Sequence, residues 1–198
     1  MKKEVVLITG GSGLLAKHAK KMLQDDYTVR LLTTNKKKLD EEQFYYWDIE
    51  KKHVDLDSLK GCHHIIHLAG HPILSKWNKK NREKIHASRI TSTKILLEEC
   101  KKNHFKIKTF ICASAIGLYN DNNKEIKKEE SKKGENWVSY LVEEWEKTAA
   151  EFKSIGSRVV QMRISLIFSK NGGFLKYNML SMKYGLGIMI GPKDKIIN

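Results

Sequence analysis

Short apolar runs rich in β-branched residues alternate along this chain with longer segments of helical periodicity. We expect strands at Val5–Thr9, Thr28–Thr33, Phe44–Trp47, Cys62–Ala69, Ile107–Ala113 and Arg158–Arg163. Hydrophobicity is nearly continuous within the best of these runs, which is typical of strands buried on both faces. Because strands that alternate with helices form parallel βαβ units, the pattern predicts an α/β protein with a parallel sheet.

Two segments carry the clearest helical pattern, Asn78–Lys102 and Trp137–Phe152. Each has an apolar stripe, and we expect both stripes to face the core. The stretch Asp121–Glu135 is polar and rich in lysine, which predicts a long surface loop. The pair Gly172-Gly173 predicts a break before a last short helix.

The chain is strongly basic, with 37 Lys and Arg against 23 Asp and Glu among 198 residues and a formal net charge of +14. Such a charge raises the question of a polyanionic partner. The lysines, however, come in short scattered clusters such as Lys36–Lys38, Lys79-Lys80 and Lys132-Lys133, which indicates solvated faces. We therefore expect no nucleic-acid partner, because such a partner would require lysines gathered on one face.

Neither a membrane anchor nor a disulfide framework is expected. The longest uncharged runs, Val5–Ala16 and Gly61–Ser75, fall short of the roughly 20 residues that span a bilayer. Cys62, Cys100 and Cys112 are odd in number, far apart and without a CxxC pair. This cysteine usage fits a reducing cytoplasm.

Four histidines, His63, His64, His67 and His71, lie close together in the sequence. Side chains alternate along a strand, so His63 and His67 share a face while His64 points the other way, and we expect no metal site. His71 differs, because it follows Leu68-Ala69-Gly70 at the carboxyl end of a strand, where ligands gather in open α/β sheets. His71 is therefore a candidate for substrate contact.

The first strand runs directly into a glycine-rich segment of the form GxxGxxA, followed by an apolar-periodic segment that ends near Gln24. Gly10 allows a tight turn, Gly13 lets the backbone approach a pyrophosphate, and the small Ala16 permits close packing of helix on strand. The pyrophosphate would sit on the helix N-terminus, at its free N–H groups. We predict a Rossmann-type dinucleotide site rather than a structural turn, with the loop residues Thr9, Gly10, Gly11, Ser12, Gly13, Leu14 and Leu15 as its phosphate-binding part.

The end of the second strand indicates which dinucleotide binds. An Asp or Glu there would bond the ribose hydroxyls of NAD, but the segment reads Thr33-Thr34-Asn35-Lys36-Lys37 and holds no acid. Its hydroxyl, amide and ammonium groups favour NADP over NAD, although an exposed loop in a lysine-rich protein explains them too. Asp48, just past the third strand, either bonds the adenine or serves as a turn residue.

With these elements placed, the chain resembles the extended short-chain dehydrogenases/reductases of the NAD-dependent epimerase/dehydratase superfamily, and within it the atypical branch of epimerase family proteins. The resemblance rests on GGSGLLA, HLAGHPI, Trp77, the SRITST stretch, CASAIGLY, the pair Trp145-Glu146 and RISLIFS. It implies that the cofactor is lined by Gly10, Gly13, Leu68, Ala69 and Gly70, that Ser165 lies near its nicotinamide end, and that Ser114 is the active-site serine. Arg89, within SRITST, is a further cofactor-binding candidate.

The chain departs from the family in its catalytic pair. Ordinary members use Tyr-xxx-Lys, in which the tyrosine is the general acid/base and the lysine lowers the tyrosine pKa. Here Tyr140 is followed four residues later by Glu144, and Tyr140 points away from the apolar stripe, so we expect it at the surface. If Glu146 aligns with the acidic residue that often follows the pair, Val138 and Val142 take the two positions, and neither moves protons.

The resemblance also implies a domain organisation. We expect an NAD(P)-binding Rossmann domain over residues 1–165, a doubly wound sheet of strand order 3-2-1-4-5-6, and the start of an incomplete substrate-binding domain over residues 166–198. Relatives continue for about another hundred residues, a domain-sized piece.

Taken together, these features predict an oxidoreductase or epimerase that binds NADP(H) and acts on a small hydroxyl or carbonyl compound or a sugar nucleotide. Ser114 would bond the reacting oxygen, and Tyr119 or His71 would transfer the proton, although each is also explained as a structural residue. The alternative is a catalytically silent NADP-binding sensor or interaction protein. The resemblance further implies a homodimer that pairs the helices at Asn78–Lys102 and Trp137–Phe152.

Overall fold

The computed structural model describes residues 2–73, 75–119, 126–169, 171–173 and 179. The chain has two compact units. The first comprises Met1–Ala113 and Glu143–Met162, and the second comprises Ser114–Val142 and Arg163–Asn198. The domain boundary expected between residues 165 and 166 stays a prediction, since most of the segment beyond it lies outside the described residues.

One sheet of seven strands has the order β4-β3-β2-β1-β5-β6-β7. Its strands are β1 Val5–Thr9, β2 Thr28–Thr33, β3 Phe44–Asp48, β4 His53–Val54, β5 Cys62–His67, β6 Thr109–Ala115 and β7 Arg158–Ile164. The predicted α/β fold and the order 3-2-1-4-5-6 of the six predicted strands are confirmed. The two-residue β4 was not predicted; it pairs antiparallel with β3 at the edge of the sheet.

Strand β1 lies at the centre of the sheet and is buried along its whole length. It pairs in parallel with β2 and with β5, so that Leu7 lies opposite Arg30 on one side and Ile65 on the other. Parallel strands covered on both faces need apolar side chains at nearly every position, which explains the unbroken run of β1.

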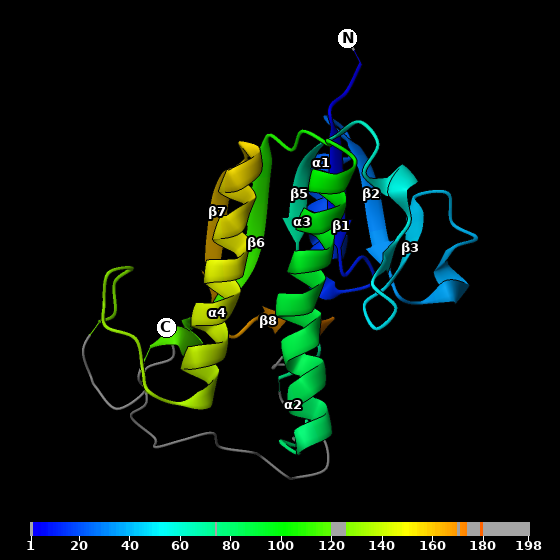
Figure 1. The fold of residues 1–198 in the computed structure, drawn as a ribbon. Helices are drawn as coiled ribbons and strands as arrows, with labels where there is room; N and C mark the ends of the chain where they lie inside the picture. Colours follow the sequence, from blue (N-terminus) through cyan, green and yellow to red (C-terminus); the bar gives the residue numbers. More distant parts are fainter. Residues whose placement is uncertain (1, 74, 120–125, 170, 174–178, 180–198) are drawn as a thin grey trace. The chain divides into compact units, whose positions relative to one another are not determined.

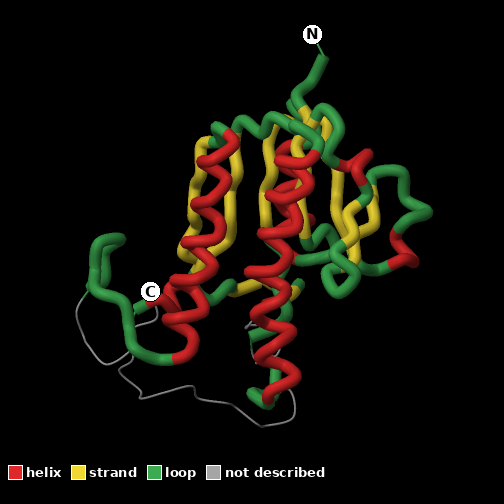
Figure 2. The backbone as a smooth tube through the Cα atoms, in the orientation of Figure 1, coloured by secondary structure: helices red, strands yellow, loops and turns green. Residues whose placement is uncertain are grey.

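Helices cover the sheet on both faces. Helix α1, Leu14–Leu23, follows β1, and its Ala16 packs in a buried cluster with Val6, Ile8 and Leu31. Because successive side chains of a strand point to opposite faces, Leu7 and Thr9 face the other side of the sheet. On that other face lie α3, Ser92–Lys102, and α4, Trp137–Ala150, which Figures 1 and 2 show in front of the strands.

The predicted helix Asn78–Lys102 is one continuous helical segment in three parts. Helix α2, Lys79–His86, begins with Asn78, whose side chain accepts a hydrogen bond from the Asn81 N–H at 2.9 Å. A π-helical turn, Ala87–Thr91, then joins α2 to α3. Such turns inside helices occur frequently at functional sites.

Buried aromatic rings pack in a row on the face of the sheet that α3 covers. The ring of His67 lies edge-on to Trp47 with centroids 6.2 Å apart and stacks on Phe110 at 5.9 Å. Phe110 in turn stacks on Phe152 at 3.7 Å with an interplanar angle of 5°. Phe152 belongs to the 3₁₀ segment Glu151–Ile155, which continues α4.

Shorter elements complete the described chain. They are the 3₁₀ turns Lys36–Lys38, Leu56–Ser58 and Ile116–Leu118 and the two-residue strand β8, Phe168–Ser169. Residues 121–125 of the predicted surface loop, and most of the segment after Gly173 where a last helix was predicted, lie outside the described residues. Among the residues that the structure describes, none of the helices has the length and apolar character that a membrane span requires.

Candidate functional site: a pocket at the carboxyl ends of the strands

The glycine-rich turn after β1 is built so closely that side chains would not fit. Gly10 has φ +68°, and a Cβ placed on it would lie 3.1 Å from the Leu68 carbonyl oxygen and from Ala69 Cα. Such a distance is tighter than nearly all real Cβ contacts. The turn therefore needs glycine for its backbone angle and for the close approach of the β5 end.

Helix α1 starts at this turn with its first N–H groups uncapped. Gly13 is the N-cap residue, it offers no side chain to the helix, and the first turn holds no acidic residue. A Cβ on Gly13 would lie 3.0 Å from the Gly10 carbonyl oxygen, to which the Gly13 N–H donates at 2.8 Å. Free N–H groups and the positive end of the helix dipole make this end of α1 suited to an anion.

A pocket of about 650 Å³ opens beside the turn. Its volume falls in the range of about 300 to 1,000 Å³ that is typical of small-molecule and cofactor sites. It is lined entirely by residues of the first unit, which come from the carboxyl ends of β1, β2, β3 and β5 and from the helical segment after them: Gly10, Ser12, Gly13, Leu32, Thr33, Thr34, Asn35, Tyr46, Trp47, Asp48, Ile49, Glu50, Leu68, Ala69, Gly70, His71, Pro72, Lys84, Ala87 and Ser88.

Most of the predicted cofactor residues meet at this pocket. Ten of them line it, namely Gly10, Ser12, Gly13, Thr33, Thr34, Asn35, Asp48, Leu68, Ala69 and Gly70. The predicted residues Thr9, Gly11, Leu14, Leu15, Lys36, Lys37 and Arg89 belong to the same unit but are not part of the lining. Their role toward a cofactor stays a prediction.

At the end of β2, short hydrogen bonds shape the loop. Thr33 Oγ1 accepts from the Asn35 N–H at 3.1 Å, and Asn35 Oδ1 accepts from the Lys37 N–H at 3.1 Å. The Lys36 ammonium lies 5.4 Å from the centroid of the Tyr46 ring, and Tyr46 lines the pocket. Lys38 is engaged elsewhere, since its Nζ pairs with Glu41 at 2.5 Å. Lys36 is thus the lysine of this turn that contacts a pocket residue.

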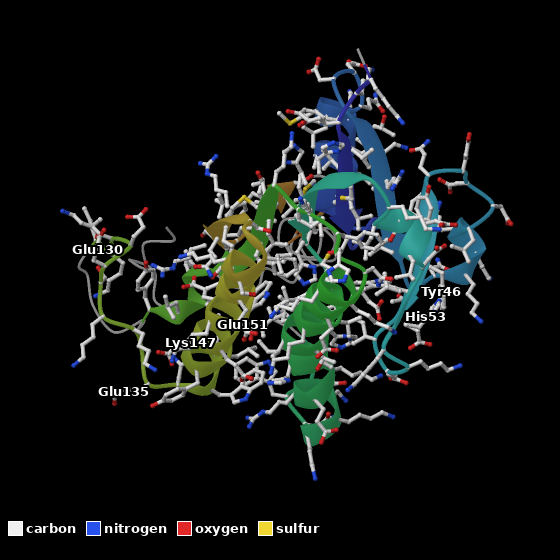
Figure 3. All side chains as sticks on the ribbon, turned by 45° about the horizontal axis from the view of Figure 1, so that its top comes forward. Tyr46, His53, Glu130, Glu135, Lys147 and Glu151 are labelled. Atoms are coloured by element: carbon white, nitrogen blue, oxygen red, sulfur yellow. The ribbon has the colours of Figure 1, made fainter. Side chains whose placement is uncertain are left out.

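Asp48 serves as a turn residue and also lines the pocket, while its bond to an adenine stays a prediction. It lines the pocket, and its side chain also accepts from the Lys51 N–H at 3.1 Å and from the Tyr46 hydroxyl at 3.3 Å. The Lys51 N–H is the main reason why the pKa of Asp48 lies below its usual value. Tyr46 also lies beside His53 of β4, with ring centroids 6.1 Å apart (Figure 3).

A buried polar network behind the pocket fixes the end of β5. The N–H groups of Leu68 and Ala69 both donate to Thr9 Oγ1 at 3.0 Å. The Thr9 hydroxyl is therefore left to donate to His67 Nδ1, 2.8 Å away, and His67 Nε2 donates to Ser92 Oγ at 3.1 Å. Burial lowers the pKa of His67 to about 3, so its imidazole is neutral at pH 7.

The backbone of His71 is held on both sides by hydrogen bonds from the π-helical turn. The His71 N–H donates to Ser88 Oγ at 2.8 Å, and Arg89 Nη1 donates to the His71 carbonyl at 3.1 Å. A Cβ on Gly70 would lie 3.2 Å from Arg89 Nη2, so the guanidinium lies directly against Gly70. Arg89 also lies over the Trp145 ring at 5.2 Å, and burial lowers its pKa to about 10. These contacts place a half-buried cation next to the pocket wall.

Comparison with known proteins identifies the family of this chain. The model of the NAD dependent epimerase/dehydratase family matches residues 6–174. The chain belongs to this family. It is 28% identical over 194 residues to an epimerase family protein of Staphylococcus saprophyticus and 27% identical over 197 residues to the epimerase family protein YfhF of Bacillus subtilis. The alignments cover 93% and 94% of this chain but 62% of each relative, so the chain spans less than two thirds of their length.

Solved structures share the fold. The nucleoside-diphosphate sugar epimerase of Corynebacterium glutamicum matches with a TM-score of 0.77 and 28% identity over 96% of this chain and 39% of that one. The human epimerase family protein SDR39U1, solved with NADPH, matches with a TM-score of 0.79 and 23% identity over 92% of this chain and 61% of that one. The resemblance to the epimerase/dehydratase superfamily, predicted from GGSGLLA and the motifs after it, is confirmed.

Three of the predicted site residues, Ser114, Tyr119 and Ser165, belong to the second unit. Ser114 is buried at the end of β6, and Ser165 is half-buried just after β7. The Tyr119 hydroxyl accepts a hydrogen bond from Arg163 Nη1 at 2.6 Å. Tyr140 is 51% exposed on α4, as predicted. Of the predicted catalytic residues, His71 belongs to the first unit, whereas Ser114 and Tyr119 belong to the second.

Sequence reasoning missed several pocket residues: Tyr46, Trp47, Ile49, Glu50, Pro72, Lys84, Ala87 and Ser88. The first four flank Asp48, so the rule that ligands gather at strand ends would have found them. Lys84, Ala87 and Ser88 lie on α2 and the π-helical turn, and such a turn has no signature in a single sequence.

Proposed function

We propose that the pocket binds a nicotinamide dinucleotide, NADP(H) in preference to NAD(H), and that the protein is an oxidoreductase or epimerase acting on a small hydroxyl or carbonyl compound or a sugar nucleotide. The observation that carries the proposal is the uncapped N-terminus of α1, which opens beside a 650 Å³ pocket across a turn that only glycine fits. Backbone N–H groups at such a place bind the pyrophosphate of dinucleotides.

The residues of the pocket fit this cofactor. The first N–H groups of α1, from Leu14 onward, would hold the pyrophosphate, and Thr33 to Asn35 would contact the adenosine ribose. Asp48 and Ile49 line the wall where the adenine would lie. When bound, the nicotinamide supplies reversible hydride transfer.

The residues at the end of β2 support the preference for NADP. Thr33, Thr34 and Asn35 offer no carboxylate that would repel a 2′-phosphate, and Lys36 contacts the pocket residue Tyr46. The human relative was solved with NADPH, whereas a UDP-glucuronic acid 4-epimerase of Bacillus cereus was solved with NAD. The family therefore allows either dinucleotide, and the charge of the β2 turn favours the phosphorylated one.

For catalysis, we propose that Ser114 donates a hydrogen bond to the reacting oxygen and that His71 or Tyr119 exchanges the proton. His71 lines the pocket, and burial, followed by the charges of Lys84 and Arg89, lowers its pKa. A neutral imidazole can accept a proton at pH 7. Tyr119 is held by the guanidinium of Arg163, which orients its hydroxyl.

A catalytically silent dinucleotide-binding protein is the second candidate. It is favoured by Tyr140, which is exposed to solvent on α4. If Glu146 aligns with the acidic residue that follows the family's pair, Val138 and Val142 take the Tyr and Lys positions, and this favours it too. A side chain without a titratable group does not lower the pKa of a neighbour or exchange a proton.

We propose a reducing compartment, such as the cytoplasm, for this protein. Cys62, Cys100 and Cys112 are buried free thiols. Burial raises the pKa of Cys62 to about 11 and that of Cys100 to about 12, so these thiols stay protonated and unreactive.

Calorimetric titration of NADP(H) and NAD(H) tests the binding proposal. Gly13→Asp places a carboxylate where the pyrophosphate would lie, and we expect binding of both dinucleotides to be lost while the fold is kept. Gly13→Ala is the matched control, because it adds the Cβ without the charge, and its dinucleotide affinity should fall far less. Unchanged affinity in Gly13→Asp would refute the placement of the site.

Turnover separates the two candidate functions. NADPH oxidation is measured with a panel of aldehydes, ketones and nucleotide sugars, in wild type and in Ser114→Ala. We expect weak turnover, because Val138 and Val142 supply no proton donor. Activity that falls with Ser114→Ala supports the oxidoreductase, and tight binding without turnover across the panel favours the silent protein.

A further inference from the structure

A second hollow, of about 250 Å³, lies at the opposite end of the strands from the dinucleotide pocket. Its lining comes from the amino ends of β1 and β5, from the residues before them and from Arg30 within β2: Lys2, Lys3, Val5, Arg30, Lys60, Gly61 and His63. Strand β1 begins at Val5 in this hollow and ends at Thr9, next to Gly10 of the dinucleotide pocket. At about 3.3 Å per residue, the strand separates the two sites by about 13 Å.

A β-bulge brings His63 to this hollow. Val5 pairs with Cys62 and Val6 pairs with His64, so His63 is the extra residue between two ladder positions. The Val5 N–H donates to His63 Nδ1 at 3.1 Å. When Nδ1 accepts, the ring proton lies on Nε2, which leaves a donor on the far side of the imidazole. Bulges of this kind re-aim side chains and occur often beside functional sites.

Arg30 is held in the hollow by backbone carbonyls. Its Nη1 donates to the carbonyl oxygens of Asp57 at 2.9 Å, Ser58 at 3.1 Å and Lys60 at 2.6 Å. These bonds all use one nitrogen and fix the plane of the guanidinium. The guanidinium also lies over the Tyr45 ring at 5.8 Å. Within the described part of the chain, its Nη2 and Nε groups make no hydrogen bond, so these N–H donors offer the fork geometry that suits phosphate oxygens.

The charge of the hollow is positive. Lys2, Lys3, Arg30 and Lys60 line it, and its lining contains no carboxylate among the described residues. Asp57, nearby, pairs with Lys60 at 2.6 Å and offsets one of these charges. The Lys3 ammonium donates to the Gln24 carbonyl oxygen at 3.4 Å, which leaves its positive charge uncompensated. Like charges gathered around one hollow repel one another, and a bound anion relieves that repulsion.

We propose that this hollow binds a small phosphoryl anion, inorganic phosphate or pyrophosphate, independently of the dinucleotide. The donors for one phosphoryl group would be the Arg30 guanidinium, which backbone carbonyls hold in place, the His63 imidazole at the bulge, and two or more lysines. The volume of 250 Å³ suits a ligand of that size rather than a nucleotide.

Residue-resolved NMR titration of the whole chain with pyrophosphate, at constant ionic strength, tests the proposal. We expect saturable shifts of the Lys3, Gly61 and His63 amides that follow a binding curve of their own, separate from any shift of Gly11 and Gly13. Lys3→Gln and Lys60→Gln should each weaken the affinity about threefold to tenfold, because each removes one charge-assisted bond at a solvated site. The matched controls are Lys94→Gln and Lys101→Gln, exposed positions on α3 that should leave the affinity unchanged.

Three outcomes would overturn the proposal. Shifts centred on Gly11 and Gly13 would mean that the anion enters the dinucleotide pocket. Equal weakening by the α3 variants would mean that the net charge of +14 attracts anions without a site. A short oligonucleotide that binds far more tightly than pyrophosphate, and shifts lysines on several faces, would mean an extended polyanion surface.

Discussion

The hydroxyl of Thr9 donates a hydrogen bond to Nδ1 of His67 across 2.8 Å in the interior of the first unit. The same oxygen accepts the N–H groups of Leu68 and Ala69, so one threonine joins the end of β1 to the pocket wall that follows β5. Both residues are fully buried, and an unsatisfied polar group there would be costly. The arrangement therefore depends on a neutral His67.

A protonated His67 would break this network, which predicts a pH dependence of stability. The unfolded chain takes up a proton near pH 6.5, whereas the native protein does so only near its pKa of about 3. Because the unfolded state binds more protons in that window, the free energy of unfolding falls as the pH is lowered from 6.5 toward 3, by up to about 1.4 kcal/mol per pH unit.

Urea unfolding between pH 7 and pH 4.5 measures this slope. We expect the free energy of unfolding of His67→Gln to be lower than that of wild type at pH 7. It should also fall less steeply than in wild type as the pH is lowered, because the contribution of His67 is gone. His18→Gln, at an exposed position of α1, is the control and should keep the wild-type slope. Parallel curves for wild type and His67→Gln would contradict the assignment.

The turn after β2 predicts which lysines set the cofactor preference. Lys36→Gln should reduce the preference for NADP over NAD by about tenfold, since a charge-assisted bond to phosphate contributes about 1.5 to 3 kcal/mol before screening by salt. Lys37→Gln should act in the same direction. Lys38→Gln is the matched control, because Lys38 already pairs with Glu41.

Calorimetric titration of both dinucleotides at two salt concentrations measures these effects. The preference should shrink at high salt in wild type and change little with salt in Lys36→Gln. Equal affinities of wild type for the two dinucleotides, or a preference that survives both Lys36→Gln and Lys37→Gln, would defeat the prediction.

The ring stack of Phe110 and Phe152 predicts a large stability effect. Both side chains are fully buried, and their centroids lie 3.7 Å apart. Phe152→Ala would leave a cavity and should lower the free energy of unfolding by about 3 to 5 kcal/mol. Met22→Ala on α1, where the side chain is 80% exposed, should change it by no more than about 0.5 kcal/mol. A Phe152→Ala variant as stable as Met22→Ala would show that the stack is misplaced.

The homodimer expected through Asn78–Lys102 and Trp137–Phe152 stays a prediction. Leu97 and Trp145, apolar residues of those helices, are buried within the first unit. Lys147 of α4 and Glu151, the first residue of the 3₁₀ segment that follows α4, are exposed (Figure 3). A dimer through these helices would therefore pair charges and should weaken with added salt. Light scattering at high protein concentration and two salt concentrations measures this, and a monomeric mass at both would rule the dimer out.

Much of the fold could be predicted from the sequence. Val5–Thr9 and Thr28–Thr33 match β1 and β2 to the residue. The central strand β1 is covered on both faces and leaves an unbroken apolar signal, whereas in β2, buried only over its last three residues, β-branched residues and leucines gave the signal. The edge of the sheet gave a weaker signal. The pair His53–Val54 has no pattern of its own and becomes a strand only because β3 offers a free edge.

For the candidate site as well, the sequence predicted one part and the tertiary structure decided the other. The glycine spacing from Gly10 to Gly13 determined the phosphate turn, because a backbone that must pass within van der Waals contact of Ala69 leaves no room for a side chain at Gly10. Only the tertiary structure decided that His67 forms a network with Thr9 and that the π-helical turn brings Ser88 and Arg89 to His71. It also decided that a bulge brings His63 to the hollow that Arg30 lines. Those relationships join residues far apart in the chain, and they follow from the need of each buried polar group to find a partner, which no local pattern encodes.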